Sequence, residues 1–290
     1  MECPLCRKAE LRPLYKGVAD LEHGVQARAD FSECPVCRAL AQVPAPTPEA
    51  VRSFYPADYG PYLSEGFVAR LKGIQGRRLA KDLAKEFPDR GTRLVELGCG
   101  AGHLLRGLKA LGYRNIAGFD WHEPPLLKRD GIPFTAGDLE SAPLGGPYDG
   151  VLANNVLEHL LDPGAFLARL KGALAPGGRV FIRTPNADAV GRSVFGAHWS
   201  GLHAPRHLYV FTPPALEALA RRAGFVSVAV DTTPDSSSWS LSLQNALRAG
   251  GGPNAGGVGW PALLTLPFFE LPALAERAVG RGSSLRAVLS

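Results

Sequence analysis

Short apolar runs alternate with helical hydrophobic patterns along residues 92–231. This alternation is expected of a mostly parallel sheet whose two faces are covered by helices, so the pattern predicts an α/β fold. A last apolar run near the C-terminus fits one more strand at the edge of the sheet. The predicted strands are 93–97, 115–119, 133–136, 148–153, 179–184, 226–230 and 284–289.

Prolines mark the first boundary along the chain. Pro44, Pro46 and Pro48 stand in a short run that cannot be helical, and such a run gives a stiff, extended connector. Helical periodicity follows from about 67 to 87. We therefore predict a small N-terminal module, a linker with N-terminal helices, the α/β domain, and a C-terminal addition that ends in the edge strand. Their bounds are 1–46, 47–90, 91–232 and 233–290.

Four of the five cysteines lie in the N-terminal module as two CxxC pairs. Two such knuckles can hold one Zn²⁺ through four thiolates at about 2.3 Å. A disulfide pair or a redox motif is the alternative, but cytosolic thiols stay reduced and redox CxxC motifs are rarely doubled. A four-cysteine sphere is closed, so this zinc would have a structural or recognition role. The predicted ligands are Cys3, Cys6, Cys34 and Cys37.

Residues 258–275 are strongly apolar and contain one charge, Glu270. A membrane-spanning helix is one interpretation, but Pro261, Pro267 and Pro272 argue against a straight spanning helix. We therefore expect a buried cap over the active site. Peripheral contact with a membrane or a lipid-like substrate stays open as an alternative.

The chain of 290 residues is 46% hydrophobic, which is enough to bury a substantial core and favours a globular enzyme. Its net charge of +5 comes from basic residues that are scattered along the chain, so nucleic acid is not the expected partner. The N-terminus lacks the apolar run of a secretory signal. We expect a cytoplasmic protein, and the sequence does not indicate an oligomeric state.

A glycine-rich loop follows the first predicted strand of the α/β domain and precedes a helical stretch. Glycines there let the backbone turn sharply and approach a ligand above the strand end. A dinucleotide-binding loop needs Gly or Ala at its sixth position, where this chain has His103, and the carboxylate of Glu96 would repel a pyrophosphate. S-Adenosylmethionine carries a sulfonium and an amino group instead, so Glu96 favours this cofactor. The glycines are Gly98, Gly100 and Gly102.

Acidic residues also end the next two strands. Asp120 lies about twenty residues beyond the glycine loop, where a carboxylate can accept hydrogen bonds from both ribose hydroxyls. Asp138 ends the third strand and can accept from an adenine amino group, with Leu139 beside it. Each aspartate alone can be a turn residue or a helix cap, but acids at three successive strand ends favour one cofactor site. Asn154, after the fourth strand, completes the predicted cofactor residues.

These motifs resemble those of the class I S-adenosylmethionine-dependent methyltransferases over residues 92–231. The resemblance implies a Rossmann-like, doubly wound sheet of seven strands in the order 3-2-1-4-5-7-6, with the last strand antiparallel. The segments that carry it are 95–102 (VELGCGAG), Asp120, 137–138 (GD), 154–159 (NNVLEH) and 174–179 (LAPGGR).

Residues 199–212 (WSGLHAPRHLYVFT) are similar to a segment of the ubiquinone-type O-methyltransferases and related enzymes. The N-terminal module resembles the cysteine-ligated zinc module that precedes some sugar C-methyltransferases. Together these resemblances imply methyl transfer to oxygen or carbon of a small molecule, such as a sugar, a quinone-like compound or another metabolite.

His159 follows the fourth strand on the side of the predicted pocket. Methyl transfer from a cationic donor needs mainly positioning, but an acceptor hydroxyl or acidified carbon must lose a proton, and histidine suits that role. The alternative is that His159 only helps to begin a helix. Five further residues are predicted to contact the acceptor, although loop hydrogen bonds and aromatic packing explain them equally. They are Tyr59, Tyr62, His203, Arg206 and His207.

Two other functions stay open. Zinc modules also occur on enzymes that modify RNA, so an rRNA or tRNA methyltransferase is one alternative. Against it, residues 154–157 (NNVL) lack the Asn-Pro-Pro-aromatic motif of enzymes that methylate base amino groups. A zinc-ribbon adaptor with a non-catalytic domain is the other alternative, and the intact glycine and acidic positions argue against it.

Overall fold

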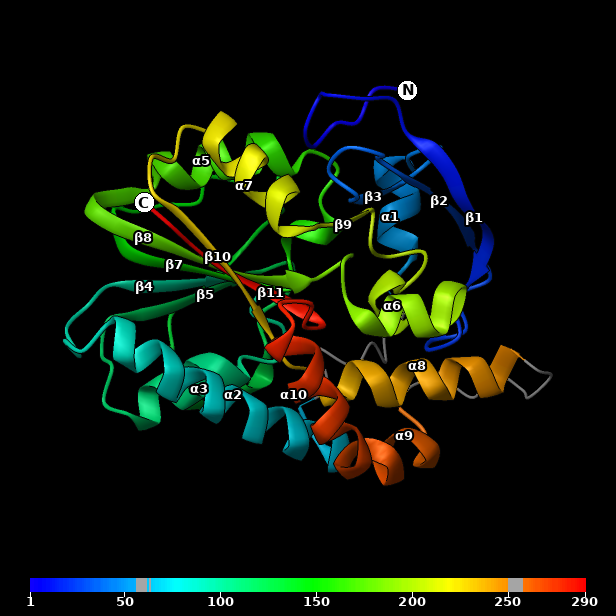
Figure 1. Ribbon diagram of the computed structural model, residues 1–290. Coiled ribbons are helices and arrows are strands. Elements are labelled where there is room, and N and C mark those ends of the chain that lie inside the picture. Colours follow the sequence, from blue (N-terminus) through cyan, green and yellow to red (C-terminus); the bar gives the residue numbers. More distant parts are fainter. Residues whose placement is uncertain (56–61, 63, 250–257) are drawn as a thin grey trace.

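A seven-stranded sheet lies at the centre of the computed structural model, which describes residues 1–55, 62, 64–249 and 258–290 (Figure 1). Its order is β6-β5-β4-β7-β8-β11-β10, and β11 runs antiparallel to both neighbours. In chain order this is 3-2-1-4-5-7-6, which confirms the predicted fold. The strands are β4 (Leu94–Leu97), β5 (Ile116–Asp120), β6 (Phe134–Ala136), β7 (Tyr148–Asn154), β8 (Leu174–Pro185), β10 (Val228–Thr233) and β11 (Ser284–Leu289).

Helices cover both faces of this sheet, and each face has its own apolar core. On one face, α2 (Gly66–Glu86), α3 (His103–Ala110) and α4 (Pro125–Asp130) pack over β4 and β5. On the other face, α5 (Pro163–Gly172) and α7 (Pro213–Arg222) cover β7 and β8 (Figure 1). Asp162 and Thr212 begin α5 and α7 as N-caps, because their side chains accept from backbone amides of the first turn.

A second, four-stranded sheet joins the N-terminal residues to the middle of the chain. It has the order β1-β2-β3-β9, with β1 (Arg12–Ala19), β2 (Arg28–Glu33), β3 (Leu40–Gln42) and β9 (Tyr209–Val210). Phe31, Leu40, Trp199 and Val210 meet in a small core beneath it. Strand pairing therefore crosses the predicted boundary at residue 46, and the division of the chain at 46, 90 and 232 stays a prediction.

Short helical turns carry the chain between the two sheets. Thr47 caps α1 (Pro48–Ser53) by accepting from the backbone amide of Ala50. The single turn η2 (Leu157–His159) follows β7. Beyond β8 the chain forms α6 (Val190–Phe195), η3 (Gly196–His198) and η4 (Ser200–Leu202), and then enters β9. These turns bring residues of the N-terminal module close to residues that follow β7 and β8.

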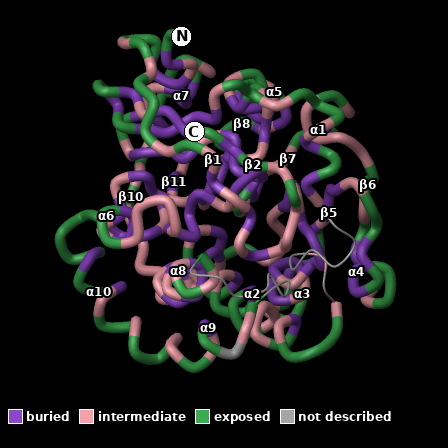
Figure 2. Tube along the Cα trace, turned by 90° about the vertical axis from the view of Figure 1, so that its right-hand side faces the viewer, coloured by how far each residue is buried: buried purple, intermediate pink, exposed green. Residues whose placement is uncertain are grey.

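The C-terminal addition differs from the expected buried cap. Its prolines divide it into α9 (Trp260–Thr265), η5 (Leu266–Phe269) and α10 (Glu270–Ala278), which pack on α8 (Ser236–Ala249). Only one side is covered: Ala262 and Ala273 are buried, whereas Leu264, Phe268 and Leu271 are exposed, as the green stretches around α9 and α10 in Figure 2 indicate. The prediction of a buried segment was wrong, because short helices on one supporting helix leave half their surface uncovered. Among the described residues, none of the helices has the length and apolar character needed to cross a bilayer.

Candidate active site

The glycine loop connects β4 to α3 at the carboxyl edge of the sheet. Gly98 and Gly102 have φ values of +66° and +79°, a region that L side chains rarely adopt. A Cβ at Gly98 would lie 2.6 Å from Cγ2 of Val156, and one at Gly102 would lie 2.2 Å from Cδ2 of Leu127. The loop therefore needs glycine for its backbone conformation and for its close packing.

Two buried carboxyl groups, Glu96 and Asp120, flank this loop. Asp120 accepts hydrogen bonds from the backbone amides of Gly100 (2.8 Å) and Trp121 (2.7 Å). Burial, together with the charge of Asp120, raises the pKa of Glu96 well above its usual range, and burial also raises the pKa of Asp120 against these amide hydrogen bonds. Oε2 of Glu96 has no hydrogen-bond partner among the described residues. Two desolvated acids, neither of which forms an ion pair within the described part of the chain, favour a cationic ligand.

The other predicted cofactor residues lie at the same edge. Asp138 follows β6, and its Oδ1 accepts from the backbone amide of Glu140 at 2.8 Å. Leu139 packs next to Gly98, and Asn154 is the last residue of β7. We call this set the cofactor edge. It consists of Glu96, Gly98, Gly100, Gly102, Asp120, Asp138, Leu139 and Asn154, all of which the fold brings together.

His159 lies in η2, directly after β7. Its Nδ1 is 3.1 Å from the carbonyl oxygen of Arg206 and 3.0 Å from the hydroxyl of Tyr55. A carbonyl can only accept, so Nδ1 carries the hydrogen and Nε2 keeps its lone pair. Burial lowers the pKa of His159 to about 4, which keeps the ring neutral. The Tyr55 ring in turn meets the Trp121 ring edge-on, with centroids 5.2 Å apart, and so links His159 to the cofactor edge.

One of the two tyrosines predicted to contact the acceptor, Tyr62, lies in the described part of the chain. Tyr62 donates from its hydroxyl to Oδ1 of Asp120 at 3.3 Å, so it lies beside the cofactor edge. Tyr59 falls outside the described residues. Tyr55 was missed by the sequence reasoning, and its only signal is its place in the same aromatic run as Tyr59 and Tyr62.

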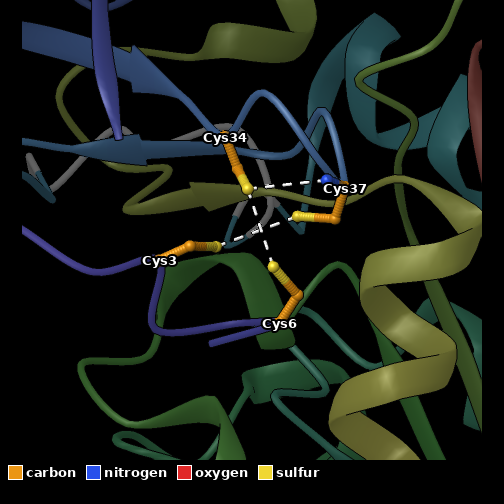
Figure 3. A group of neighbouring side chains, drawn as sticks. All are labelled: Cys3, Cys6, Cys34 and Cys37. Carbon is orange, nitrogen blue, oxygen red and sulfur yellow. Dashed lines mark hydrogen bonds between the residues drawn. The ribbon is translucent and has the colours of Figure 1, made fainter. Parts of the chain in front are cut away.

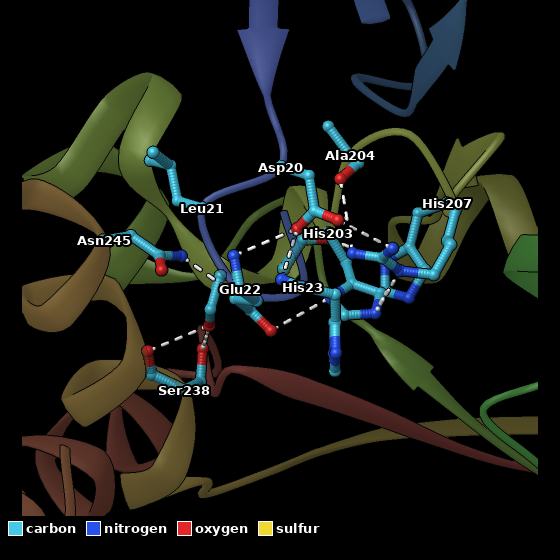
Figure 4. A network of polar contacts seen from close by, with 12 residues as sticks. Asp20, Leu21, Glu22, His23, His203, Ala204, His207, Ser238 and Asn245 are labelled. Atoms are coloured by element: carbon cyan, nitrogen blue, oxygen red, sulfur yellow. Dashed lines mark hydrogen bonds and ion pairs between the residues drawn. The ribbon is translucent and has the colours of Figure 1, made fainter. Parts of the chain in front are cut away.

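Residues 203–207 form a tight turn that we call the histidine turn (Figure 4). Nδ1 of His203 lies 3.1 Å from Oε2 of Glu22, and Nδ1 of His207 donates to the carbonyl of Gly201 at 2.9 Å. The ring centroids of His203 and His207 are 5.0 Å apart, and those of His207 and His159 are 4.7 Å apart. Burial holds the pKa of both turn histidines well below the usual range, so the three rings form a neutral cluster.

Arg206 holds the histidine turn in place from within. Its guanidinium is fully buried and donates to Oδ2 of Asp20 (2.9 Å), the carbonyl of Phe54 (3.1 Å) and Nε2 of His203 (2.8 Å). These contacts fit a positioning role for Arg206, and the acceptor contact expected from the sequence stays a prediction. Its partner Asp20 comes from the N-terminal module, and no sequence pattern connects the two.

Four buried cysteines converge from the two knuckles of the N-terminal module (Figure 3). Their Sγ atoms lie within 4.8 Å of one another, with Cys3 and Cys37 3.8 Å apart and Cys6 and Cys34 3.6 Å apart. A tetrahedral ion with bonds of about 2.3 Å separates its ligands by roughly 3.8 Å. The cysteines therefore fit one Zn²⁺ without rearrangement of the chain.

A second group with metal-ligand chemistry lies beside the histidine turn. One carboxylate oxygen of Glu158 and one ring nitrogen each of His159 and His207 come within 4.8 Å of one another. Glu158 is fully buried, and burial raises its pKa to about 8. Two neutral imidazoles and one carboxyl group are able to hold a divalent cation or to share a proton.

Comparison with known proteins identifies the family. A family model described as a methyltransferase domain matches residues 71–230, which is more than half of the chain. The chain belongs to this methyltransferase domain family. It is an S-adenosylmethionine-dependent methyltransferase, as its motifs predicted.

Named relatives agree with this assignment. The ubiquinone biosynthesis O-methyltransferase of Cereibacter sphaeroides is 34% identical over 181 residues, which cover 56% of this chain and 72% of that protein. The tRNA U34 carboxymethyltransferase of Methylococcus capsulatus is 28% identical over 189 residues, covering 61% and 57%. Among solved structures, the 1,6-didemethyltoxoflavin-N1-methyltransferase of Burkholderia thailandensis aligns with a TM-score of 0.51 and 18% identity over 96% of this chain and 98% of that one. The last likeness shows a shared fold.

The family match in this methyltransferase begins in α2 and ends in β10. It includes the cofactor edge, His159 and the histidine turn, and it leaves the four cysteines outside. The roles of the individual residues stay predictions.

Proposed function

We propose that this methyltransferase moves the methyl group of S-adenosylmethionine to an oxygen or carbon atom of a small metabolite. The observation that carries the proposal is the pair of buried carboxyl groups, Glu96 and Asp120, beside the glycine loop. Their environment favours the sulfonium and amino groups of this cofactor over a phosphate. Similarity to a ubiquinone biosynthesis O-methyltransferase supports a small acceptor and favours oxygen as its reacting atom.

In this proposal the cofactor edge holds S-adenosylmethionine, which supplies an electrophilic methyl group when bound. The glycine loop lets the backbone approach the cofactor closely, and Glu96 attracts its cationic end. Asp120 accepts from the ribose hydroxyls, and Asp138 faces the adenine amino group. Leu139 and Asn154 border the site. Most of the rate enhancement then comes from holding donor and acceptor in line.

His159 takes the acceptor proton in this proposal. Its Nδ1 hydrogen is fixed by the Arg206 carbonyl, so the lone pair on Nε2 is the basic position. Tyr59, Tyr62, His203 and His207 are proposed to face the acceptor, while Arg206 keeps the turn in place. The neutral ring leaves the Nε2 lone pair free, but its pKa of about 4 makes it a weaker base than an ordinary histidine. General-base catalysis contributes about 10²–10⁴-fold and is most efficient when the pKa lies near the operating pH, so in this proposal a bound acceptor raises the pKa of His159.

Calorimetry of the full chain with S-adenosylmethionine tests the proposal. We expect saturable binding by the parent, and transfer of labelled methyl to a catechol-type or sugar acceptor. His159→Gln should keep the cofactor affinity and lose about 10²-fold or more of the transfer rate. Absence of cofactor binding by the parent would overturn the proposal, whereas an unchanged rate in His159→Gln would remove only the base assignment.

We further infer that the four cysteines bind one structural Zn²⁺. All four sulfurs would be used, so no position is left for substrate and the ion acts on folding alone. Metal analysis should find about one zinc per chain, and Cys37→Ser should lower both the zinc content and the unfolding temperature. Absence of zinc after purification from metal-replete medium would contradict this inference. A cytoplasmic location, where thiols stay reduced, fits this zinc site.

Similarity to a tRNA-modifying enzyme supports RNA as a second candidate acceptor. The buried histidine cluster favours a small acceptor over a folded RNA. Methylation of bulk tRNA, with binding that weakens steeply as salt rises, would favour the RNA alternative. Contact of residues 258–275 with a lipid-like acceptor also stays a prediction.

A further inference from the structure

An exposed apolar stripe runs along the C-terminal helices. Leu264, Phe268 and Leu271 follow one another at helical spacing from α9 into α10, and they are 66%, 78% and 76% exposed. Leu274 continues the stripe at 49%. The opposite side is packed on α8 through Ala262 and Ala273, so the fold fixes which side faces outward. Large apolar side chains gathered in this way mark an interaction surface.

A basic stripe lies on the neighbouring helix α2. Phe67 and Ile74 are exposed on it, and the basic residues between and beyond them share its outer face at spacings of three and four residues. None of Arg70, Arg77 and Arg78 forms an ion pair with another residue of the described part of the chain. The exposed basic residues of α2 are Arg70, Arg77, Arg78, Lys81 and Lys85.

The helices that carry the two stripes lie on one side of the molecule. Helices α2, α9 and α10 all lie below the central sheet in Figure 1, and α2 and α9 remain together at the bottom of Figure 2. Helices α9 and α10 pack on α8. Helix α2 also lies near α8, because its Lys72 interacts electrostatically with Asp235, the residue directly before α8. We call the combined surface of α2, α9, η5 and α10 the basic apolar face.

We propose that the basic apolar face docks on an anionic lipid surface. Phe67, Phe268 and Leu271 enter the boundary between headgroups and acyl chains, and the arginines of α2 meet the lipid phosphates. Apolar anchors beside clustered basic residues are the combination that holds proteins on such surfaces. Three exposed acids accompany this face, Glu65, Asp82 and Glu270. Asp82 pairs with Lys85 at 2.8 Å and Glu270 accepts from Ser236 at 2.9 Å, so the basic residues still outnumber the acids on this face.

A second copy of this chain fits the same face less well. A two-fold dimer places one patch against an identical patch. The five basic residues of α2 would then face five others, with few acids to offset them. RNA would match the charge but gains nothing from three exposed leucines and a phenylalanine. An anionic bilayer satisfies both the charge and the apolar groups.

Sedimentation of the full chain with lipid vesicles tests the proposal. We expect binding to vesicles of phosphatidylcholine with phosphatidylglycerol, weak binding to phosphatidylcholine alone, and loss of binding at high salt. The double variant Phe268→Ser, Leu271→Ser should bind at least about tenfold more weakly, because both apolar anchors are removed. Val226→Ser is the matched control: Val226 is 82% exposed but lies between α7 and β10, so its vesicle binding should equal that of the parent.

A charge reversal completes the experiment. Arg70→Glu with Arg78→Glu should weaken binding to the anionic vesicles by tenfold or more, whereas Arg114→Glu, at an exposed site before β5, should not. Cofactor binding by calorimetry should be unchanged in every variant, which separates this surface from the catalytic proposal.

Two results would overturn the docking proposal. The first is equal vesicle binding by the parent and the Phe268→Ser, Leu271→Ser variant, or no binding by either. The second is evidence that another partner binds the basic apolar face. A parent that dimerises in ultracentrifugation and becomes monomeric in that variant would assign the face to a second copy, and salt-sensitive binding to RNA in place of vesicles would assign it to nucleic acid.

Discussion

Asp20 and Arg206 form an ion pair in which both side chains are buried, with Oδ2 of Asp20 and Nη1 of Arg206 2.9 Å apart. The two residues are 186 positions apart, and their pairing fastens the N-terminal module to the histidine turn. Oδ1 of Asp20 also accepts from the backbone amides of Glu22 and His23, so one carboxylate organises the loop that carries both. The module is thereby tied to the region in which we place the acceptor.

Asp20→Asn should be strongly destabilising. The amide would leave the buried charge of Arg206 without compensation, and breaking a pair of this kind costs about 3–5 kcal/mol. Chemical denaturation monitored by circular dichroism measures the change. The control is Asp149→Asn, whose pairing with Arg93 is half exposed and worth at most about 1 kcal/mol. Equal effects of the two substitutions would contradict a special role for the buried pair.

Acid should weaken this pair in a defined window. Burial alone would raise the pKa of Asp20, but the hydrogen bond and charge of Arg206 outweigh it and hold the pKa at about 2. An aspartate in the unfolded chain titrates near 3.9, so the unfolded state binds the proton first. The stabilisation is complete above about pH 4 and is lost as the pH falls towards 2. The stability difference between parent and Asp20→Asn should therefore shrink over that range.

Gln42 provides a second link between the module and the histidine turn. Its buried side-chain amide donates to the carbonyls of Pro205 (2.6 Å) and His207 (2.9 Å). Gln42→Met keeps the volume but leaves both carbonyls unpaired, at a cost of about 2 kcal/mol or more. We expect methyl transfer to fall while the affinity for S-adenosylmethionine stays the same, because the cofactor edge is untouched. Gln26→Met, at an exposed site in the same module, should change neither; a loss of cofactor affinity in Gln42→Met would argue against a local role.

The sequence predicted the elements whose signals are local. Residues 150–153 form a continuous buried run, and Glu96 to Gly102 stand together in the chain, so periodicity and spacing reveal them. The contacts of Asp20 and Gln42 could not be predicted, because no local pattern encodes pairings between residues more than 160 positions apart. Strand β9 has two residues and is too short to show any period. The apolar segment 258–275 was misjudged because composition does not say which side of a helix is covered.

Gly102→Ala should lower the free energy of unfolding by more than an alanine at positive φ normally does. The new methyl group would meet Leu127 at 2.2 Å, in addition to the strain of φ +79°. We expect a loss of about 2–4 kcal/mol in unfolding free energy and a large fall in cofactor affinity. Gly131→Ala is the matched control, since Gly131 has φ +61° but no atom within 4 Å of the new Cβ. It should cost about 1 kcal/mol. Similar losses in both variants would show that packing against Leu127 does not matter.

Binding of S-adenosylmethionine should release protons through Glu96. In the free protein, burial and the neighbouring Asp120 raise the pKa of Glu96 well above its usual range, so the carboxyl group holds its proton more tightly. A bound cation favours the ionised form and lowers that pKa. The cofactor affinity should therefore rise with pH until Glu96 is ionised in the free protein. Calorimetry in buffers of different ionisation enthalpy measures the protons released. Glu96→Gln should bind more weakly and lose this dependence, whereas Glu86→Gln, remote from the cofactor edge, should retain it. A parent affinity independent of pH would contradict the role given to Glu96.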